Sequence, residues 1–233
     1  MRKAERRGTL VSERRSAALC APTMPRPFVI GLTGGIASGK STIAKRLADE
    51  LGTLLECDKL GWRAYDPKDG KEGAACRDAL EAAFKGDAEG GTLLAEDGTV
   101  DRRKLGPIVF SAKAKMDELN GIVWPRIAAM AEKELEEMGS RGVKVVVMEA
   151  AVLLEAGWDA WVDEVWVVSC PAAKQQARLC SRNNLKPEDA AKRLASQMSL
   201  EERVGKADVV IDNGGTLTIA TIQALAAIRT PRW

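Results

Sequence analysis

From residue 28 onward, short apolar runs alternate with longer stretches in which apolar residues recur at helical spacing. Runs of about four to eight mostly apolar residues that stop at glycine, proline or polar clusters are typical of strands buried in a parallel sheet. On this basis the sequence predicts strands over residues 28–33, 53–56, 143–148, 163–170 and 207–212.

The stretches between these strands carry helical periodicity and helix-capping residues. The sequence predicts helices over residues 40–51, within 58–84, over 101–110, 111–138 and 171–182, from 187, from 199 and over 217–228. Asp101 and Ser111 are placed to cap helices, and Pro171 to begin one. Ser199 and Glu202 have the spacing of a capping box. Strands separated by helices indicate an α/β fold with a parallel sheet flanked by helices.

One segment carries a phosphate-binding motif. Residues 34–41, GGIASGKS, fit the pattern G-x-x-x-x-G-K-[ST] between the first predicted strand and the next helix. Its glycines let backbone N–H groups close around phosphates, and the helix N-terminus adds positive potential. Lys40 is predicted to reach the β- and γ-phosphates, and Ser41 to place its hydroxyl on Mg²⁺. The predicted ATP-binding residues of this loop are Gly34, Gly35, Ile36, Ala37, Ser38, Gly39, Lys40, Ser41 and Thr42.

Two arginines favour a small-molecule kinase over other P-loop proteins, and the chain has no NKxD-like guanine motif. Arg178 and Arg182 are spaced i,i+4 and therefore share one face of a predicted helix. Two guanidinium groups there can clamp a transferring phosphoryl group, whose charge is spread over its oxygens. A solvated helix face is the alternative interpretation of this pair.

Three carboxylates lie at the ends of predicted strands. Asp58 follows the 53–56 strand, at the sheet edge where α/β proteins bind ligands, and is placed to orient an attacking hydroxyl. Helix capping is its alternative or additional role. Glu56 lies on the same side two residues earlier, next to Cys57, which is interpreted as a small buried residue. Glu149 is a candidate for binding Mg²⁺-coordinated water, or else a solvated strand end.

The amino-acid composition excludes several kinds of catalytic and binding site. The chain has no histidine, which excludes a His-based triad, a His general base and His metal ligands. Its five cysteines form no CxxC pair, as is typical of reduced thiols in an intracellular protein. Seven basic and two acidic residues give residues 1–27 a charge of +5, and the remaining 28 basic and 31 acidic residues give −3. The body therefore offers no basic surface for nucleic acid.

The basic segment, residues 1–27, is predicted to be a disordered tail. It lacks the apolar run of a secretory signal, and no run of about 18 apolar residues predicts a membrane span. We therefore expect a cytoplasmic protein. A mitochondrial or other organellar location is the alternative if the tail is a transit peptide, and Met24 is an alternative start. The six tryptophans are expected mostly in the core.

Taken together, the motifs resemble those of dephospho-CoA kinases. The matching segments are GLTGGIASGKST (31–42), ECD (56–58), DRRKL (101–105), WPRI (124–127), AAVLLEAGW (150–158) and ADVVIDNGG (207–215). Arg178, Arg182 and Gln197 match positions in and after the lid of these enzymes. The pattern is closest to the kinase half of animal-type CoA synthase, because of the Trp-Pro pair in WPRI, the segment GWRAY (61–65) and the segment LLEAGW.

The resemblance implies a P-loop NTPase fold of the nucleoside-monophosphate-kinase type over residues 28–229. It implies a helical CoA domain at about 58–138 and a lid at about 172–198. The implied reaction is ATP·Mg²⁺-dependent phosphorylation of the ribose 3′-hydroxyl of dephospho-CoA, the last step of coenzyme A synthesis. Implied roles are hydroxyl orientation by Asp58, phosphate binding by Lys40, Arg178 and Arg182, substrate contacts by Arg103 and Glu155, and adenine contacts by Asn213 and Gly214.

Two other functions are consistent with the residues alone: another small-metabolite P-loop kinase, and a non-catalytic CoA- or nucleotide-binding module. The intact Lys40 and Ser41 favour an enzyme. Glu56, Asn183 and Trp124 replace the family's more usual Asp, Asp and bacterial His, but none of them belongs to the P-loop. We expect ATP and dephospho-CoA as partners, with neither nucleic acid nor membrane, and the oligomeric state is open.

Overall fold

The computed structural model describes residues 26–228, so nearly all of the predicted tail, residues 1–27, lies outside the described residues. Five parallel strands form one sheet in the order β2-β3-β1-β4-β5. They are β1 (Phe28–Thr33), β2 (Leu54–Glu56), β3 (Val145–Glu149), β4 (Glu164–Ser169) and β5 (Val209–Asp212). The predicted parallel α/β fold is therefore confirmed, with strand ends shifted by one or two residues.

Strand β1 is the centre of the sheet, because it pairs with β3 on one side and β4 on the other. Alternate residues of a strand point to opposite faces. Ile30, which pairs with Val147, belongs to one buried cluster, while its neighbour Val29 belongs to the other. Both faces of the sheet are thus covered, which explains why its strands are almost continuously apolar.

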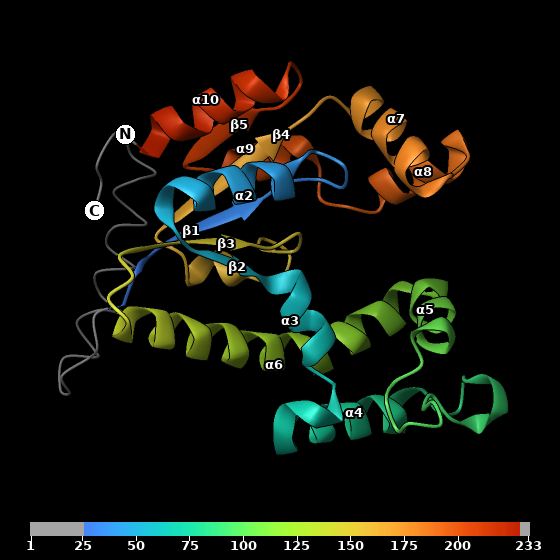
Figure 1. Ribbon diagram of the computed structural model, residues 1–233. Helices are drawn as coiled ribbons and strands as arrows, with labels where there is room; N and C mark the ends of the chain where they lie inside the picture. Colours follow the sequence, from blue (N-terminus) through green and yellow to red (C-terminus); the bar gives the residue numbers. More distant parts are fainter. Residues whose placement is uncertain (1–25, 229–233) are drawn as a thin grey trace.

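Helices cover the two faces of the sheet (Figure 1). On one face lie α2 (Lys40–Leu51) and α10 (Leu217–Ile228), which contribute Ile43 and Ala220 to the cluster around Ile30. On the other face lies α6 (Lys113–Ser140), which contributes residues such as Ile127 to the cluster around Val29. Among residues 26–228, no helix has the length and apolarity needed to span a membrane.

The remaining helices lie around one end of α6 or beyond β4. Helices α3 (Cys57–Arg63), α4 (Gly70–Phe84) and α5 (Arg102–Ser111) all contact α6 and occupy the stretch predicted as the CoA domain. Helices α7 (Ala172–Asn183) and α8 (Pro187–Ala195) pack together and occupy the stretch predicted as the lid. Helix α9 (Leu200–Lys206) follows, and short 3-10 turns cover Pro67–Asp69, Glu89–Gly91 and Trp158–Ala160.

Two of the predicted helix starts are wrong. Helix α5 continues through Ser111, whose hydroxyl donates to the carbonyl of Ile108 instead of capping the next helix. The N-cap position of α6 belongs to Ala112, so Ser111 lies one residue before it and is still part of α5. Pro171 has an extended ψ of 137° and occupies the N-cap position, so α7 begins one residue later, at Ala172. The capping box of Ser199 and Glu202 is confirmed.

Candidate active site

The P-loop connects β1 to α2 with two residues in left-handed backbone conformations. Ala37 has a φ of 58° and Gly39 a φ of 93°. A Cβ on Gly39 would collide with the side-chain amide of Asn213, and one on Gly34 would lie 2.7 Å from the carbonyl oxygen of Val168. Glycine is therefore required at both positions, because the loop is pressed against the ends of β4 and β5.

Asn213 and Arg178 hold the loop in this shape. The Nδ2 of Asn213, a buried residue just after β5, donates to the Ser38 carbonyl at 2.7 Å. Arg178 of α7 donates to the carbonyls of Ala37 and Ser38, both at 3.4 Å, and to the carbonyl of Asn213 at 3.3 Å. Segments from two later parts of the chain thus fix the curvature of the loop.

Ser41, Lys40 and Glu149 meet where α2 begins. Ser41 Oγ donates to Glu149 Oε1 at 2.5 Å, and Lys40 Nζ lies 3.9 Å from the same oxygen. Glu149 ends β3 and is 5% exposed. Its burial raises its pKa above the ordinary value, while the Ser41 hydrogen bond and the Lys40 charge oppose that rise.

Two further carboxylates approach Glu149. Glu56 pairs with Glu149 in the register of β2 and β3, and its own carboxylate forms an ion pair with Lys59. Asp58 lies exposed in the first turn of α3. The charges of Asp58 and Glu56 both contribute to the raised pKa of Glu149. The three carboxylates therefore act on one another electrostatically at the carboxyl edge of the sheet.

A pocket of about 680 Å³ opens beside the P-loop. Its lining residues are Ala37, Gly39, Lys40, Ser41, Thr42, Ala177, Arg178, Ser181, Arg182, Asn213 and Leu217. The predicted phosphate-binding cations Lys40, Arg178 and Arg182 thus line one cavity, although they come from distant segments. Arg182 also donates from Nε to the side chain of Asn183 at 2.9 Å. Gly214, just beyond Asn213, donates its N–H to Asp212 Oδ1 at 2.7 Å.

The structure does not bring Arg103 and Glu155 into this pocket. Arg103 lies exposed near the start of α5. Glu155 accepts a hydrogen bond from Arg203 Nη2 at 2.5 Å. Its other oxygen, Oε2, is buried without a hydrogen-bond partner.

Sequence reasoning overlooked Arg203, a buried arginine behind the P-loop. This side chain is 1% exposed and donates to Thr33 Oγ1 at 3.3 Å and to the carbonyl of Ala151 at 3.4 Å. It sits in α9 after two glutamates, a context typical of a solvated helix face. Gln197, in the turn between α8 and α9, accepts a hydrogen bond from the Ile36 N–H at 2.7 Å.

These features define a P-loop kinase: the P-loop follows the central strand of a parallel sheet, carboxylates lie at the edge of that sheet, and cations surround one pocket. The family model for dephospho-CoA kinase matches residues 28–218. The chain belongs to the dephospho-CoA kinase family.

Individual relatives agree with this assignment. The dephospho-CoA kinase of Carboxydothermus hydrogenoformans is 38% identical over 206 residues, covering 88% of this chain and 95% of the relative. That of Geobacter sulfurreducens is 41% identical over 189 residues, covering 81% and 90%. The solved dephospho-CoA kinase from Campylobacter jejuni has a TM-score of 0.61 at 26% identity, covering 86% of this chain and 95% of that one.

A solved protein from Thermus thermophilus is also similar in structure. Its TM-score is 0.72 at 29% identity, and the match covers 88% of this chain and 97% of that one.

The family match and the relatives confirm the predicted fold, enzyme class and reaction. The chain is an ATP-dependent kinase of this family, which phosphorylates dephospho-CoA in coenzyme A synthesis.

Proposed function

We propose that the chain transfers the γ-phosphoryl group of ATP to the ribose 3′-hydroxyl of dephospho-CoA beside the P-loop. The observation that carries the proposal is the convergence of Lys40, Arg178 and Arg182 on one pocket. A phosphoryl-transfer transition state has little covalent chemistry for the protein to perform, so catalysis depends on positioning and charge stabilisation. Three cations around one cavity supply that stabilisation.

The ATP phosphates are proposed to lie in the loop from Gly34 to Thr42, with Lys40 at the β- and γ-phosphates. Backbone N–H groups at the start of α2 supply hydrogen bonds to them, and the helix dipole favours their charge. Asn213 and Gly214 are proposed to flank the ATP adenine. In support, the turn that carries them packs directly against the P-loop.

The donor set beside the loop fits Mg²⁺. This cation prefers oxygen ligands and keeps several waters, so one or two protein oxygens and the substrate phosphates suffice. Ser41 Oγ and the Glu149 carboxylate provide such oxygens next to each other. Among residues 26–228, no cluster of three acidic or cysteine side chains would hold a metal without substrate. When bound with ATP, Mg²⁺ neutralises phosphate charge, and we assign Ser41 to hold it directly and Glu149 to hold its water.

Asp58 is proposed to accept a hydrogen bond from the 3′-hydroxyl and to aim that oxygen at the γ-phosphorus. It is exposed at the carboxyl edge of the sheet, on a helix that is anchored in the core. Arg103 and Glu155 remain proposed substrate contacts.

Residues 58–138 are proposed to form the CoA domain and residues 172–198 a mobile lid. Arg178 and Arg182 belong to α7 and already line the pocket, so closure of the lid over the phosphates would exclude water as an acceptor. We also propose a reducing compartment, in the first place the cytoplasm. In support, Cys57, Cys76, Cys170 and Cys180 are all free thiols.

The test is to identify the product and the acceptor. The protein is incubated with ATP and Mg²⁺ and, in separate reactions, dephospho-CoA, AMP, shikimate or gluconate. Of the four acceptors, we expect only dephospho-CoA to give a product heavier by one phosphate. Phosphorus NMR should place that phosphate on the 3′-oxygen. Phosphorylation of a different acceptor at a comparable rate, or of another position, would overturn the proposal.

A further inference from the structure

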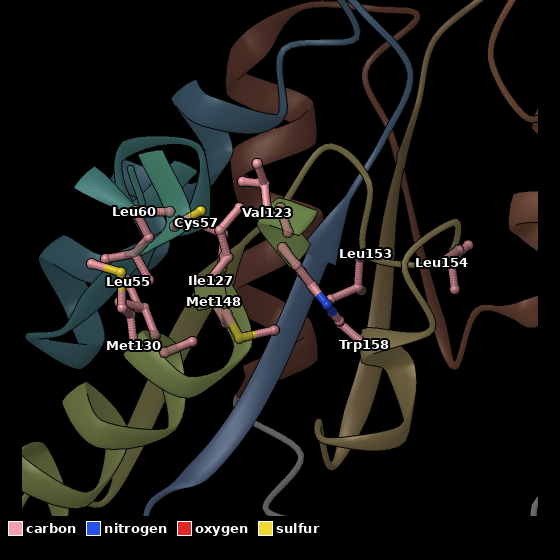
Figure 2. Close-up of a cluster of buried hydrophobic side chains, with 14 of the residues drawn as sticks. Leu55, Cys57, Leu60, Val123, Ile127, Met130, Met148, Leu153, Leu154 and Trp158 are labelled. Atoms are coloured by element: carbon pink, nitrogen blue, oxygen red, sulfur yellow. The ribbon is translucent and has the colours of Figure 1, made fainter. Parts of the chain in front are cut away.

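Helix α3 has one face in the core and one face in solvent. Cys57 and Leu60 are each 2% exposed and pack toward Val123 and Ile127 of α6, as Figure 2 shows. With these residues turned inward, the exposed residues Asp58 and Trp62 lie on the outward side of the helix. They are spaced i,i+4, so their Cβ atoms are about 5–6 Å apart on one face.

Trp62 differs from the tryptophans of the core. Its side chain is 61% exposed, whereas Trp158 and Trp166 are 3% and 0% exposed. Tryptophan is a large apolar side chain that is highly buried on average. Position 62 is therefore a departure from the expectation that the tryptophans lie mostly in the core.

Arg102, the first residue of α5, lies over the exposed tryptophan. Its guanidinium carbon is 5.0 Å from the centroid of the Trp62 ring and 5.7 Å from that of Tyr65. Tyr65 is partly buried against the core and limits where the guanidinium can move. Arg102 forms no ion pair with any residue in the range 26–228. Its charge is thus held by aromatic rings rather than neutralised by an acid.

We propose that Trp62, together with Arg102, forms the stacking surface for the adenine of the acceptor dephospho-CoA. This inference rests on the proposed function, in which Asp58 binds the 3′-hydroxyl. The adenine is attached to the same ribose as that hydroxyl, so the base must lie within a short distance of Asp58. Trp62, one helical turn away on the same face, presents the exposed aromatic ring in that position.

The chemistry of the surface suits this part of the acceptor. Nucleobases stack on aromatic side chains and on guanidinium planes, and the positive charge of Arg102 also favours the nearby diphosphate of dephospho-CoA. The ATP adenine would lie at the opposite end of the site, near Asn213. The surface around Trp62 is therefore assigned to the acceptor and not to the phosphate donor.

The test compares Trp62→Ala, Trp62→Phe and Ile222→Ala in the full chain. Ile222 is also 61% exposed but lies in α10 on the opposite side of the sheet from α6, so it controls for removal of an exposed apolar side chain. Calorimetry measures the Kd for dephospho-CoA, and steady-state kinetics measures the KM for each substrate. We expect Trp62→Ala to weaken dephospho-CoA binding roughly tenfold to hundredfold, since stacking is lost. The KM for ATP in Trp62→Ala, and the Kd for dephospho-CoA in Ile222→Ala, should stay within about threefold of wild type. Trp62→Phe keeps an aromatic ring and should therefore lose less affinity for dephospho-CoA than Trp62→Ala.

A second acceptor separates stacking from other effects. An abasic analogue of dephospho-CoA, which keeps the ribose 3′-hydroxyl but lacks the adenine, is compared with dephospho-CoA in a double-mutant cycle. Trp62→Ala should lower kcat/KM for dephospho-CoA strongly and for the abasic analogue less than about twofold. Equal losses on both acceptors, or unchanged binding in Trp62→Ala, would overturn the stacking assignment while leaving the proposed function intact. Failure of the wild-type protein to phosphorylate dephospho-CoA would instead refute the proposed function.

Discussion

The hydroxyl of Ser41 donates a 2.5 Å hydrogen bond to Glu149, joining the end of the P-loop to the end of β3. These residues are 108 positions apart in the chain. The contact forms because β1 and β3 are parallel neighbours, so that their carboxyl ends lie at one edge. It gathers two oxygen donors and the Lys40 ammonium group at the start of α2.

The first prediction concerns Glu149→Gln. Glutamine has the same shape and can still accept from Ser41, but it carries no charge to orient metal-bound water. We expect kcat to fall about 10- to 100-fold and the Mg²⁺ concentration needed for half-maximal rate to rise. The matched control is Glu56→Gln, whose carboxylate is already paired with Lys59 and whose effect should be smaller. Kinetics at several Mg²⁺ concentrations would contradict this account if Glu149→Gln behaved as wild type.

The second prediction separates Arg178 and Arg182, the two arginines of the proposed lid. Arg178 donates to three carbonyls around the P-loop, whereas within residues 26–228 the Arg182 side chain donates only to its neighbour Asn183. Both alanine variants should lower kcat roughly tenfold or more. Arg178→Ala should also lower the Tm, by about 3–6 °C, while Arg182→Ala should leave it unchanged. Thermal unfolding of both variants checks this, and equal Tm values would show that Arg178 does not stabilise the loop.

The third prediction concerns Arg203. Replacing this buried arginine by methionine removes its hydrogen bonds to the Glu155 carboxylate and to three other acceptors: Thr33 Oγ1 and the carbonyls of Ala151 and Met198. We expect Arg203→Met to lower the free energy of unfolding by about 3–5 kcal/mol, measured by urea denaturation. Arg141→Met is the control, because the Arg141–Glu137 ion pair lies on the surface and should change stability by less than about 1 kcal/mol. Similar losses of unfolding free energy in both variants would refute a structural role for the buried arginine.

The fourth prediction concerns the reactivity of Cys57. Burial, helped by the charge of Asp58, raises the pKa of this thiol to about 12. The folded state thus favours the neutral thiol, and the reactive thiolate forms only as the pH approaches 12. Iodoacetamide at pH 8 to 9 should leave Cys57 unmodified in the native protein and modify it in urea, as measured by peptide mass spectrometry. Rapid alkylation of native Cys57 would contradict this, and Cys180, which is partly exposed, provides the internal comparison.

Local signals in the sequence predicted the frame of the site. Strand β1, the glycine-rich loop and α2 follow one another with the expected spacing, and the i,i+4 pair Arg178 and Arg182 does lie on one side of α7, along the pocket. Contacts between distant segments were not predictable in this way. The Asn213 amide clamps the loop through its side chain, and Arg203 is buried although its helix is rich in charge. Neither arrangement has a periodic or spacing signal, because each depends on how the strands pack side by side.

Trp62 and Ser111 show the same limit on a smaller scale. A tryptophan is expected in the core, but Leu60 and Cys57 occupy the inward face of α3 and leave position 62 outside. Ser111 has the chemistry of a helix cap, yet its hydroxyl bonds within α5 and a single extended residue, Ala112, separates the two helices. In both cases the residue type allows two positions, core or surface for Trp62 and helix cap or helix end for Ser111, and the packing of neighbouring residues determines which one is observed.

The central claim is that Lys40 and Asp58 serve one reaction, the transfer of phosphate from ATP to dephospho-CoA. The most direct measurement is ADP release from ATP·Mg²⁺ with and without dephospho-CoA, for the wild type, Lys40→Ala and Asp58→Asn. We predict acceptor-dependent ADP release in the wild type, its loss in Lys40→Ala, and in Asp58→Asn a much lower kcat with little change in the KM for ATP. ADP release that ignores the acceptor, or wild-type turnover in Lys40→Ala, would contradict the account.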